Sequence, residues 1–392
     1  MRGLLTVFRK EVMENLRDKR TIIAALVFGP LFGPLLLAAS LQLMVDRGAA
    51  RAEAPITVAV AHAERAPNLV AFLEQNAVTV ERVGYDDAQA RAAVLDRRQK
   101  AVVAVPEDFG ARLAAAKPAP LLLYADASDM FNDSHVDRLR ALLARHTQSL
   151  AQLRLLARGV DPASVVPIAV QDVDVATPSS RAVVVLGVMS FLVIFATLAG
   201  GTYLAIDATA GERERGSLES LLTTPVRRTH IIYGKILATC AYMLASLVLT
   251  VIACAVAVRF VRLEDFGMTA NLGPLTVLGI IAAVATLIPL GAALMTVVAS
   301  FTRSYREAQS YLSFVIMVPT MPLAFIGALG LQPTPALMAV PSLGQHFMMT
   351  SLLRGEGLAL QSFAISAGAS LALGALLAWI AGRLYERESI LG

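Results

Sequence analysis

Long apolar blocks are the feature of this sequence that most limits how the chain can fold. Six of them match the length of an α-helix that crosses a bilayer, at residues 22–45, 182–206, 231–258, 275–301, 312–331 and 363–381. A shorter apolar piece, 336–353, is interrupted by Pro341, Gly344, Gln345 and His346, which is typical of a re-entrant or interfacial helix pair. Only 16% of the chain is charged, whereas soluble proteins carry roughly 25%. The sequence therefore predicts an α-helical polytopic membrane protein with six transmembrane helices and a re-entrant segment.

Lysine and arginine are distributed unevenly among the segments that join these blocks. They gather in the leader 1–20, in the loop 207–230, in the loop after the fourth block and in the C-terminal tail. The opposite short loops hold only Arg259, Arg262 and Arg354. Because short cytoplasmic loops are enriched in these residues, we expect both termini in the cytoplasm and residues 46–181 outside. This asymmetry also accounts for the net charge of +4, so no nucleic-acid partner is expected.

The first block, within residues 21–45, follows a long charged leader. Its apolar core is longer than that of most signal peptides, which favours an uncleaved membrane anchor. The remaining spans would then be 182–206 and four more within 231–392, which includes the re-entrant segment at 336–353 and a short cytoplasmic tail.

Residues 46–181 are soluble in character and alternate between strand-like and helical runs. The strand-like runs are 55–62, 77–84, 100–106, 120–126 and 167–176, and the helical runs are 68–76, 86–98 and 134–158. This alternation predicts a small α/β domain with a partly parallel sheet, inserted between the first two spans. The oxygen-rich run 126–135 lacks the glycine and final glutamate of a calcium loop, so we interpret it as a loop and helix cap. No metal site or catalytic residue is predicted in the domain.

A phosphate-binding loop of the usual pattern is missing from the sequence. Such a loop ends in Gly-Lys-Ser or Gly-Lys-Thr, but the only Gly-Lys pair here, Gly234-Lys235, precedes Ile236 at the start of a membrane helix. The centres of the apolar blocks hold essentially no Asp, Glu, Lys or Arg, which argues against a buried proton relay. We therefore expect a non-catalytic chain without a cofactor of its own, and an energy source on another polypeptide.

The charged run "DATAGERERGSLESLLTTP" (207–225) joins the second and third spans. Leu218, Leu221 and Leu222 follow helical spacing, which predicts a short amphipathic helix on the cytoplasmic membrane surface. The leader has a similar apolar stripe, formed by Leu5, Phe8, Val12 and Leu16. From the residues alone, the run 207–225 could equally dock a partner or simply anchor the loop.

Two segments resemble a known family. "GERERGSLESLLTTPVRRTHIIYGK" (211–235) resembles the signature of ABC-2-type export permeases, and "KEVMENLRDKRTIIAALVFGP" (10–30) resembles their N-terminal elbow helix and first span. "AVVAVPEDF" (101–109) and "AVPSLGQHFMMTSLLRGE" (339–356) resemble the branch with a large outer domain, which includes the Nat-type sodium-extrusion permeases. The resemblance covers essentially the whole chain.

This resemblance implies a permease subunit of the bacterial plasma (inner) membrane, surrounded by lipid. It would pair with a second permease copy or a paralogue and dock a separate cytoplasmic P-loop ATPase, which would bind ATP and Mg. The segment 207–230 would be the coupling loop, with contact or bracing residues Glu212, Arg213, Glu214, Arg215 and Glu219. Residues 1–20 would form the elbow helix, with candidate partners Lys10, Glu11, Arg17 and Asp18.

Other residues are candidates for hinges or for the transport pathway. They are Pro289, Pro319, Pro322, Pro341 and His346. Prolines break the helical hydrogen-bond ladder, but static kinks that improve packing are an equally good interpretation.

The substrate and the mode of action stay open at the level of sequence. A pathway with few charges favours an amphipathic or apolar substrate such as a lipid, drug or peptide, whereas the Nat-type resemblance suggests sodium. Two other functions fit the same residues. One is a force-transmitting ABC subunit that acts on envelope lipids or lipoproteins through its outer domain, and the other is a membrane receptor or sensor without an ATPase.

Overall fold

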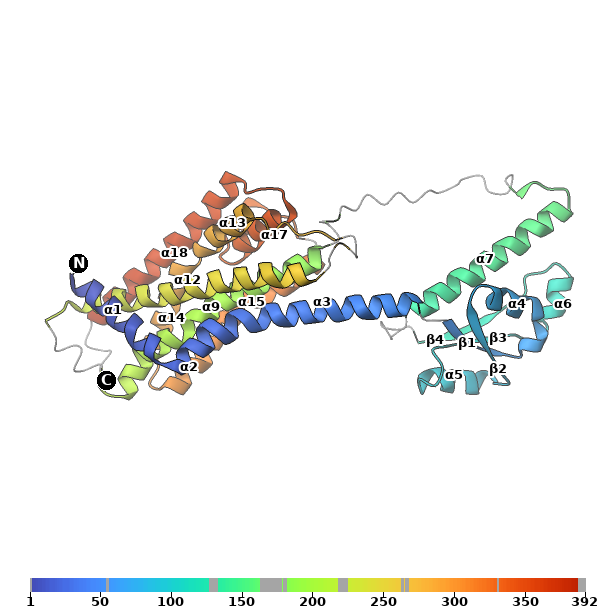
Figure 1. Cartoon of the computed structure of the whole chain (residues 1–392), viewed down its shortest axis with the longest axis horizontal. Coiled ribbons are helices and arrows are strands. Elements are labelled where there is room, and N and C mark those ends of the chain that lie inside the picture. Colours follow the sequence, from blue (N-terminus) through green and yellow to red (C-terminus); the bar gives the residue numbers. More distant parts are fainter. Residues whose placement is uncertain are drawn as a thin grey trace. The chain divides into compact units, whose positions relative to one another are not determined.

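A computed structural model describes residues 2–53, 56–126, 133–162, 178, 182–217, 225–261, 264, 268–329 and 331–386 (Figure 1). The chain divides into two compact units. The membrane unit consists of Met1–Asp46 and Val175–Gly392, and the α/β unit consists of Arg47–Asp174. The apolar helices belong to the first unit and the sheet belongs to the second.

Helices make up the described part of the membrane unit. Those that lie or begin in it are α1 (Arg2–Arg17), α2 (Lys19–Ile22), α3 (Gly29–Glu53), α9 (Val183–Ile206), α10 (Glu212–Glu214), α12 (Arg228–Phe260), α13 (Pro274–Ala285), α14 (Ile288–Ser300), α15 (Tyr305–Leu329), α16 (Pro335–Met338), α17 (Leu343–Arg354) and α18 (Leu360–Glu386). Two π-helical segments adjoin them, η1 (Ile23–Phe28) before α3 and η4 (Asp207–Gly211) between α9 and α10.

Five helical stretches among the described residues are long and apolar enough to cross a membrane. They are Ala25–Leu43, Val185–Glu214, Arg228–Phe260, Pro274–Ser300 and Leu360–Glu386, and they coincide with five of the six predicted spans. The other predicted span, 312–331, lies in α15, which is helical but is not one of these five. A total of six spans therefore stays a prediction. The interrupted piece 336–353 forms the helix pair α16 and α17.

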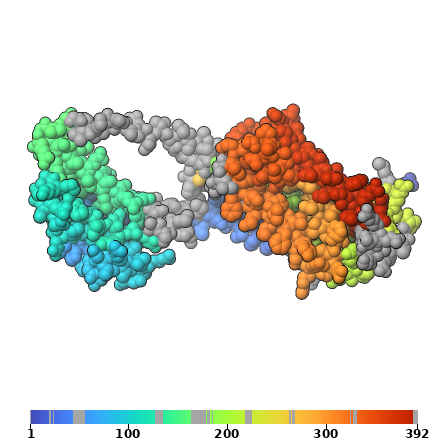
Figure 2. Space-filling view, turned by 180° about the vertical axis from the view of Figure 1, so that it is seen from behind, coloured from blue at the N-terminus to red at the C-terminus, as the bar shows by residue number. Residues whose placement is uncertain are grey.

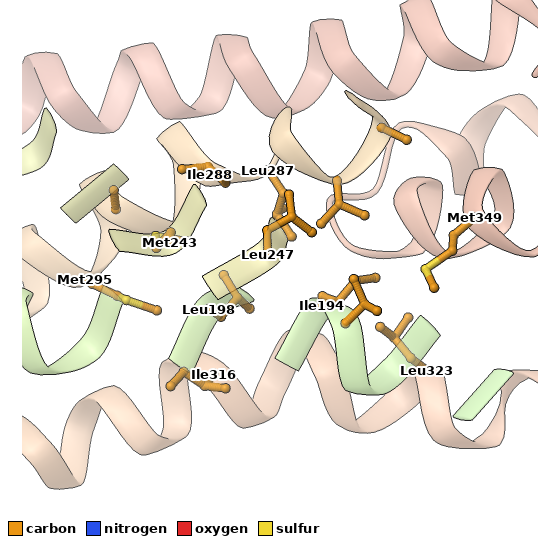
Figure 3. Close-up of a cluster of buried hydrophobic side chains, with 14 of the residues drawn as sticks. Ile194, Leu198, Met243, Leu247, Leu287, Ile288, Met295, Ile316, Leu323 and Met349 are labelled. Atoms are coloured by element: carbon orange, nitrogen blue, oxygen red, sulfur yellow. The ribbon is translucent and has the colours of Figure 1, made fainter. Parts of the chain in front are cut away.

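The interior of the membrane unit is an apolar core shared by several helices. Figure 3 shows side chains from α9, α12, α14 and α15 that converge there, among them Ile194, Leu247 and Ile316. Glycines let α9 and α12 approach closely, because a Cβ atom at Gly200 would lie 2.4 Å from Ser246 Cβ. In the space-filling view of Figure 2, the C-terminal helices of this unit, orange to red, form one continuous packed surface.

The α/β unit is built on a four-stranded sheet of order β2-β1-β3-β4. Its strands are β1 (Ile56–Ala61), β2 (Val78–Val83), β3 (Ala101–Ala104) and β4 (Leu122–Ala125), and its helices include α4 (Pro67–Gln75), α5 (Asp87–Leu95), α6 (Phe109–Ala114) and α7 (Asp133–Ala157). β1 pairs in parallel with β2 and β3, with Val58 opposite Val80 and Val60 opposite Val103, and β4 is antiparallel to β3. Four predicted strands and the partly parallel sheet are confirmed. The fifth predicted strand, 167–176, and most of the oxygen-rich run lie outside the described residues.

Both faces of this sheet are covered, which explains its apolar central strands. On one face Val58 and Val60 pack with α4 and α7, and on the other Ala59 and Ala61 pack with α5. Strands buried on both faces consist of nearly continuous apolar residues rather than alternating ones. A capping box between Asp86 and Gln89 begins α5.

Candidate functional site

A buried ion pair joins the end of the second span to the start of the third. Glu212 is the first residue of α10, and Lys235 lies two turns into α12. The Lys235 ammonium donates to Glu212 Oε2 and to the carbonyl oxygen of Ala208 in η4. Only 1% of the Lys235 side chain and 6% of the Glu212 side chain are exposed. The pair therefore ties α12 to the π-helical turn that ends the second span.

Helix α1 adds a second cation and a second carboxylate to this pair. Lys10 Nζ lies 3.0 Å from Glu212 Oε1 and 3.1 Å from Glu11 Oε1. The Glu11 side chain is 2% exposed, whereas that of Lys10 is 43% exposed. We call Lys10, Glu11, Glu212 and Lys235 the charge cluster. It joins three segments that are far apart in the sequence.

Within the cluster two cations face two carboxylates, and Lys10 Nζ also lies 3.1 Å from Oε2 of the exposed Glu14. Burial by itself lowers the pKa of the Lys10 ammonium, but the charges of Glu11 and Glu212 more than offset this and raise it above its ordinary value. Burial raises the pKa of the Glu11 carboxyl, and the positive charges of Lys235 and Lys10 offset this only in part. The arrangement is suited to holding helices together through charge rather than to catalysis.

Local backbone features make this approach of α1 and α12 feasible. A Cβ atom at Gly234 would lie 2.7 Å from Val7 Cγ1 and 3.2 Å from the carbonyl oxygen of Leu4, so only glycine lets the two helices come this close. The next residue, Lys235, is thereby brought to the face of α12 that meets α1 and α10. Its partner Ala208 lies in a π-helical turn, a feature frequently found at functional sites.

The next residues of the charged run, Arg213 to Arg215, form hydrogen bonds and an ion pair with neighbouring segments. Arg213 donates to the carbonyl oxygen of Thr302 at 3.0 Å, and Glu214 accepts from the backbone amide of Tyr305, at the start of α15, at 2.7 Å. Arg215 Nη1 lies 2.7 Å from Asp207 Oδ1 in η4. Glu214 and Arg215 are exposed, whereas Glu212 is buried. One short segment thus contacts α1, α12 and the α14–α15 turn.

Some predicted members of this region are not brought into the cluster. Glu219 and the stripe of Leu218, Leu221 and Leu222 lie outside the described residues. Arg17 and Asp18, at and just after the end of α1, are exposed and do not belong to the cluster.

Helix α1 packs against the protein through a face next to its apolar stripe, and Phe8 and Val12 of that stripe also pack there. The residues of α1 buried against the protein are Val7, Glu11 and Asn15, while Leu5 and Leu16 are 64% and 49% exposed. The face that enters the protein is therefore partly polar. Asn15 is satisfied by its own helix, donating to the carbonyl oxygen of Glu11 at 3.1 Å.

The predicted hinge prolines lie at real interruptions or inside a long helix. Pro289 lies in the first turn of α14, directly after a break in the fourth span at Thr286 and Leu287. Pro319 and Pro322 lie within α15. Their role as hinges stays a prediction.

A hydrogen bond joins the segments that contain Pro319 and Pro341. Ser342, which follows Pro341, donates from its hydroxyl to the carbonyl oxygen of Pro319 at 2.7 Å. Both prolines line an apolar cavity of about 450 Å³, with walls from α9, α14 and α15 that include Leu198, Leu294 and Phe314.

His346 lies in α17 and is 3% exposed. Its Nδ1 lies 2.9 Å from Ser190 Oγ of α9, and the residue lines a second cavity of about 440 Å³ together with Arg354 and Glu356. Its neighbour Gln345 is fully buried, and its amide group forms hydrogen bonds to three other residues. The Gln345 amide nitrogen donates to Thr286 Oγ1 at 3.1 Å and to Ser370 Oγ at 2.9 Å, and its oxygen accepts from the Ser342 amide at 2.8 Å.

Sequence reasoning missed Lys235 as a site residue. It was set aside because Gly234-Lys235 does not continue as a phosphate-binding loop. The signal that could have found it is its position, because an ionisable residue inside an apolar span needs a partner. Gln345 was noticed only as an interruption, although a buried amide likewise needs hydrogen-bond partners.

Comparisons with known proteins agree with this architecture. The sequence profile of the ABC-2 family transporter proteins matches residues 19–383. The ABC transporter permease protein NatB of Bacillus subtilis (strain 168) is 25% identical over 361 residues, which cover 89% of each chain. Because the profile spans nearly the whole sequence, this chain belongs to the ABC-2 family of transporter proteins.

Proposed function

We propose that this chain is the membrane-spanning subunit of an exporter powered by a separate cytoplasmic ATPase, and that the charge cluster relays motion of that ATPase to the spans. The observation that carries the proposal is the position of Glu212. It directly follows the second span and is held by lysines from both α1 and α12. A displacement of the 207–230 loop would therefore move all three helices together.

Exposed and buried members of the charged run have different roles in this proposal. Glu214 and Arg215 are exposed and so are accessible to a docked ATPase. Glu212 is inaccessible to a partner in this conformation, so it acts as an internal brace. The family and the absence of a phosphate-binding loop in the sequence support an ATPase on a second polypeptide. The arginine and lysine distribution supports a cytoplasmic location for this loop.

The cavity between α9, α14 and α15 supports an apolar or amphipathic substrate. Its lining is almost entirely apolar, with Leu198, Met295, Phe314 and Val318 among its residues. Sodium finds less support, because the buried carboxylates of Glu11 and Glu212 already contact lysine. The substrate would pass beside this cavity, between this chain and a second permease copy.

The test distinguishes binding of the ATPase to this chain from transmission of the motion of the ATPase to the spans. The tagged chain is expressed in its own host and purified in mild detergent together with any P-loop ATPase that binds it, and the complex is reconstituted into vesicles. Arg215→Glu should reduce copurification of the ATPase. Glu212→Gln should leave copurification intact but uncouple ATP hydrolysis from transport of an apolar fluorescent probe.

Two controls sharpen this comparison. Arg259→Glu changes a charge in the last turn of α12, at the end expected on the opposite side, and should leave ATPase association unchanged. If no P-loop protein copurifies with the unmodified chain, the exporter proposal is wrong and a receptor is favoured. If the ATPase copurifies and no probe is transported, the force-transmitting function is favoured instead.

A further inference from the structure

The α/β unit contains a cavity that the proposed transport function does not use. It has a volume of about 330 Å³ and lies on the face of the sheet covered by α4 and α7. Its walls come from the start of α4, from α6, from the loop that follows α6, and from α7. Figure 1 shows α4 and α7 on one side of the strands, with α5 on the other. All of its lining residues belong to the described part of this unit.

The walls of this cavity are apolar. The side chains that form them include Leu69, Phe109, Leu113, Leu121, Leu143 and Leu150. Several of these are only partly buried in the protein, which leaves apolar surface open to a ligand. Contact with a hydrocarbon chain would remove this surface from water at a favourable free energy.

Three cations surround the same cavity, and no aspartate or glutamate lines it. Lys117 is exposed and has no ion-pair partner among the described residues. Arg154 Nη2 donates to the carbonyl oxygen of Leu113 at 2.9 Å, so its positive charge is not neutralised there. Arg65 reaches Glu107 at 3.4 Å, but 90% of the Glu107 side chain is exposed. An exposed pair of this kind neutralises little of the charge.

We propose that this cavity binds a single-chain amphiphile with a carboxylate head, that is, a molecule of the fatty-acid class. The leucines and Phe109 would hold the hydrocarbon chain, and Lys117 and Arg154 would hold the carboxylate. A volume of about 330 Å³ is at the lower end of ligand pockets, roughly 300–1,000 Å³, and so suits one chain rather than the two of a phospholipid. We call Arg65, Lys117 and Arg154 the cationic rim of the cavity; their positive charges would repel an amine head group.

This inference does not depend on the exporter proposal. It concerns the α/β unit alone, and a permease that transports nothing could still bind such a ligand there. The test therefore measures binding, with the full chain in nanodiscs of zwitterionic lipid.

A photoreactive dodecanoate with a diazirine at the chain end serves as the probe, and mass spectrometry locates the labelled peptides. Labelling is expected in α6 and α7, and unlabelled dodecanoate should compete at least about tenfold better than dodecylammonium. Leu150→Trp, which fills the cavity, should abolish labelling. Leu153→Trp is the matched control, because Leu153 lies on the same helix but is 62% exposed and does not line the cavity.

The charge of the rim is tested separately, which guards against a folding defect in Leu150→Trp. Lys117→Glu should weaken competition by dodecanoate about tenfold, whereas Lys117→Arg should retain it. Arg158→Glu, a charge reversal beyond the cavity, should have no effect. Equal competition by dodecylammonium, or unchanged labelling of Leu150→Trp, would overturn the proposal.

Discussion

Lys235 and Glu212 form an ion pair that is almost completely enclosed, with 1% and 6% of their side chains exposed. Removing two charges from water costs free energy, and this cost is offset only when each charge keeps its partner and its hydrogen bonds. Here the Ala208 carbonyl and Lys10 complete the set. The pair therefore makes the junction of the second and third spans sensitive to the loss of any single member.

Lys235→Met should be strongly destabilising, because it leaves the Glu212 carboxylate buried with only Lys10 as its partner. We expect a loss of about 3–5 kcal/mol, measured by chemical unfolding in detergent. The double variant Lys235→Met/Glu212→Gln should lose clearly less than the sum of the two single changes. Additive effects would show that the two residues are not energetically coupled.

Gly234→Ala should push α1 away from α12, because the new Cβ would lie 2.7 Å from Val7 Cγ1 and 3.2 Å from a backbone oxygen. The expected cost is about 1–3 kcal/mol, with faster proteolysis of α1. Gly368→Ala in α18 is the control, since no atom lies within 4 Å of its Cβ position. Equal behaviour of the two variants would argue against a tight α1–α12 contact.

The raised pKa of Glu11 predicts a dependence of stability on pH. Its carboxyl has an ordinary pKa near 4.5, which burial raises in the folded chain. Folding thus favours the protonated Glu11 carboxyl. The stability that Glu11 contributes is therefore fully present below pH 4.5, and it is lost as the pH rises through the higher pKa of the folded chain.

Glu11→Gln should remove this decline, because glutamine stays neutral at every pH. Thermal unfolding from pH 4 upward should show the variant gaining stability relative to the unmodified chain. Glu14→Gln is the control, since Glu14 also contacts Lys10 but exposes 56% of its side chain. The prediction would be contradicted if the difference in unfolding temperature between Glu11→Gln and the unmodified chain were the same at every pH.

Gln345→Leu should destabilise the helix pair α16–α17. The change leaves the Ser342 amide and the hydroxyls of Thr286 and Ser370 without their amide partner in a fully buried position. We expect a loss of about 1–3 kcal/mol for each group left unsatisfied, measured as a lower unfolding temperature. Gln361→Leu, at an exposed position of α18, should be nearly neutral. An unchanged unfolding temperature for Gln345→Leu would mean that the hydrogen bonds of Gln345 contribute little to stability.

Much of the fold follows from local pattern. The apolar blocks and the positions of four strands were predictable, because hydrophobic periodicity and strand-like runs depend on neighbours in sequence. The resemblance of the charged run and the leader likewise led to the family. The apolar run 312–331 likewise predicted a helix, but not that α15 would begin earlier, at the polar residues Tyr305–Ser310.

The charge cluster shows what sequence alone could not decide. Lys10 and Glu212 are 202 positions apart, and Lys235 was noticed only as part of a failed phosphate-loop match and as the last residue of the ABC-2-like segment, not as a partner of Glu212. The stripe of Leu5, Phe8, Val12 and Leu16 predicted a helix in the membrane interface. It did not predict that Glu11 and Asn15, on the adjacent face of the same helix, would be buried against the protein.

By itself, then, the sequence determined that this is a helical membrane protein with an additional α/β segment, because composition and periodicity are properties of continuous stretches, and its charged run and leader resembled the ABC-2 family. Only the tertiary structure decided which charges meet. A charge inside an apolar protein is tolerated where a partner reaches it, and Glu212 is reached by Lys10 of the distant helix α1, which Gly234 allows to lie close to α12. The same holds for the cationic rim of the α/β cavity, whose members come from three separate segments.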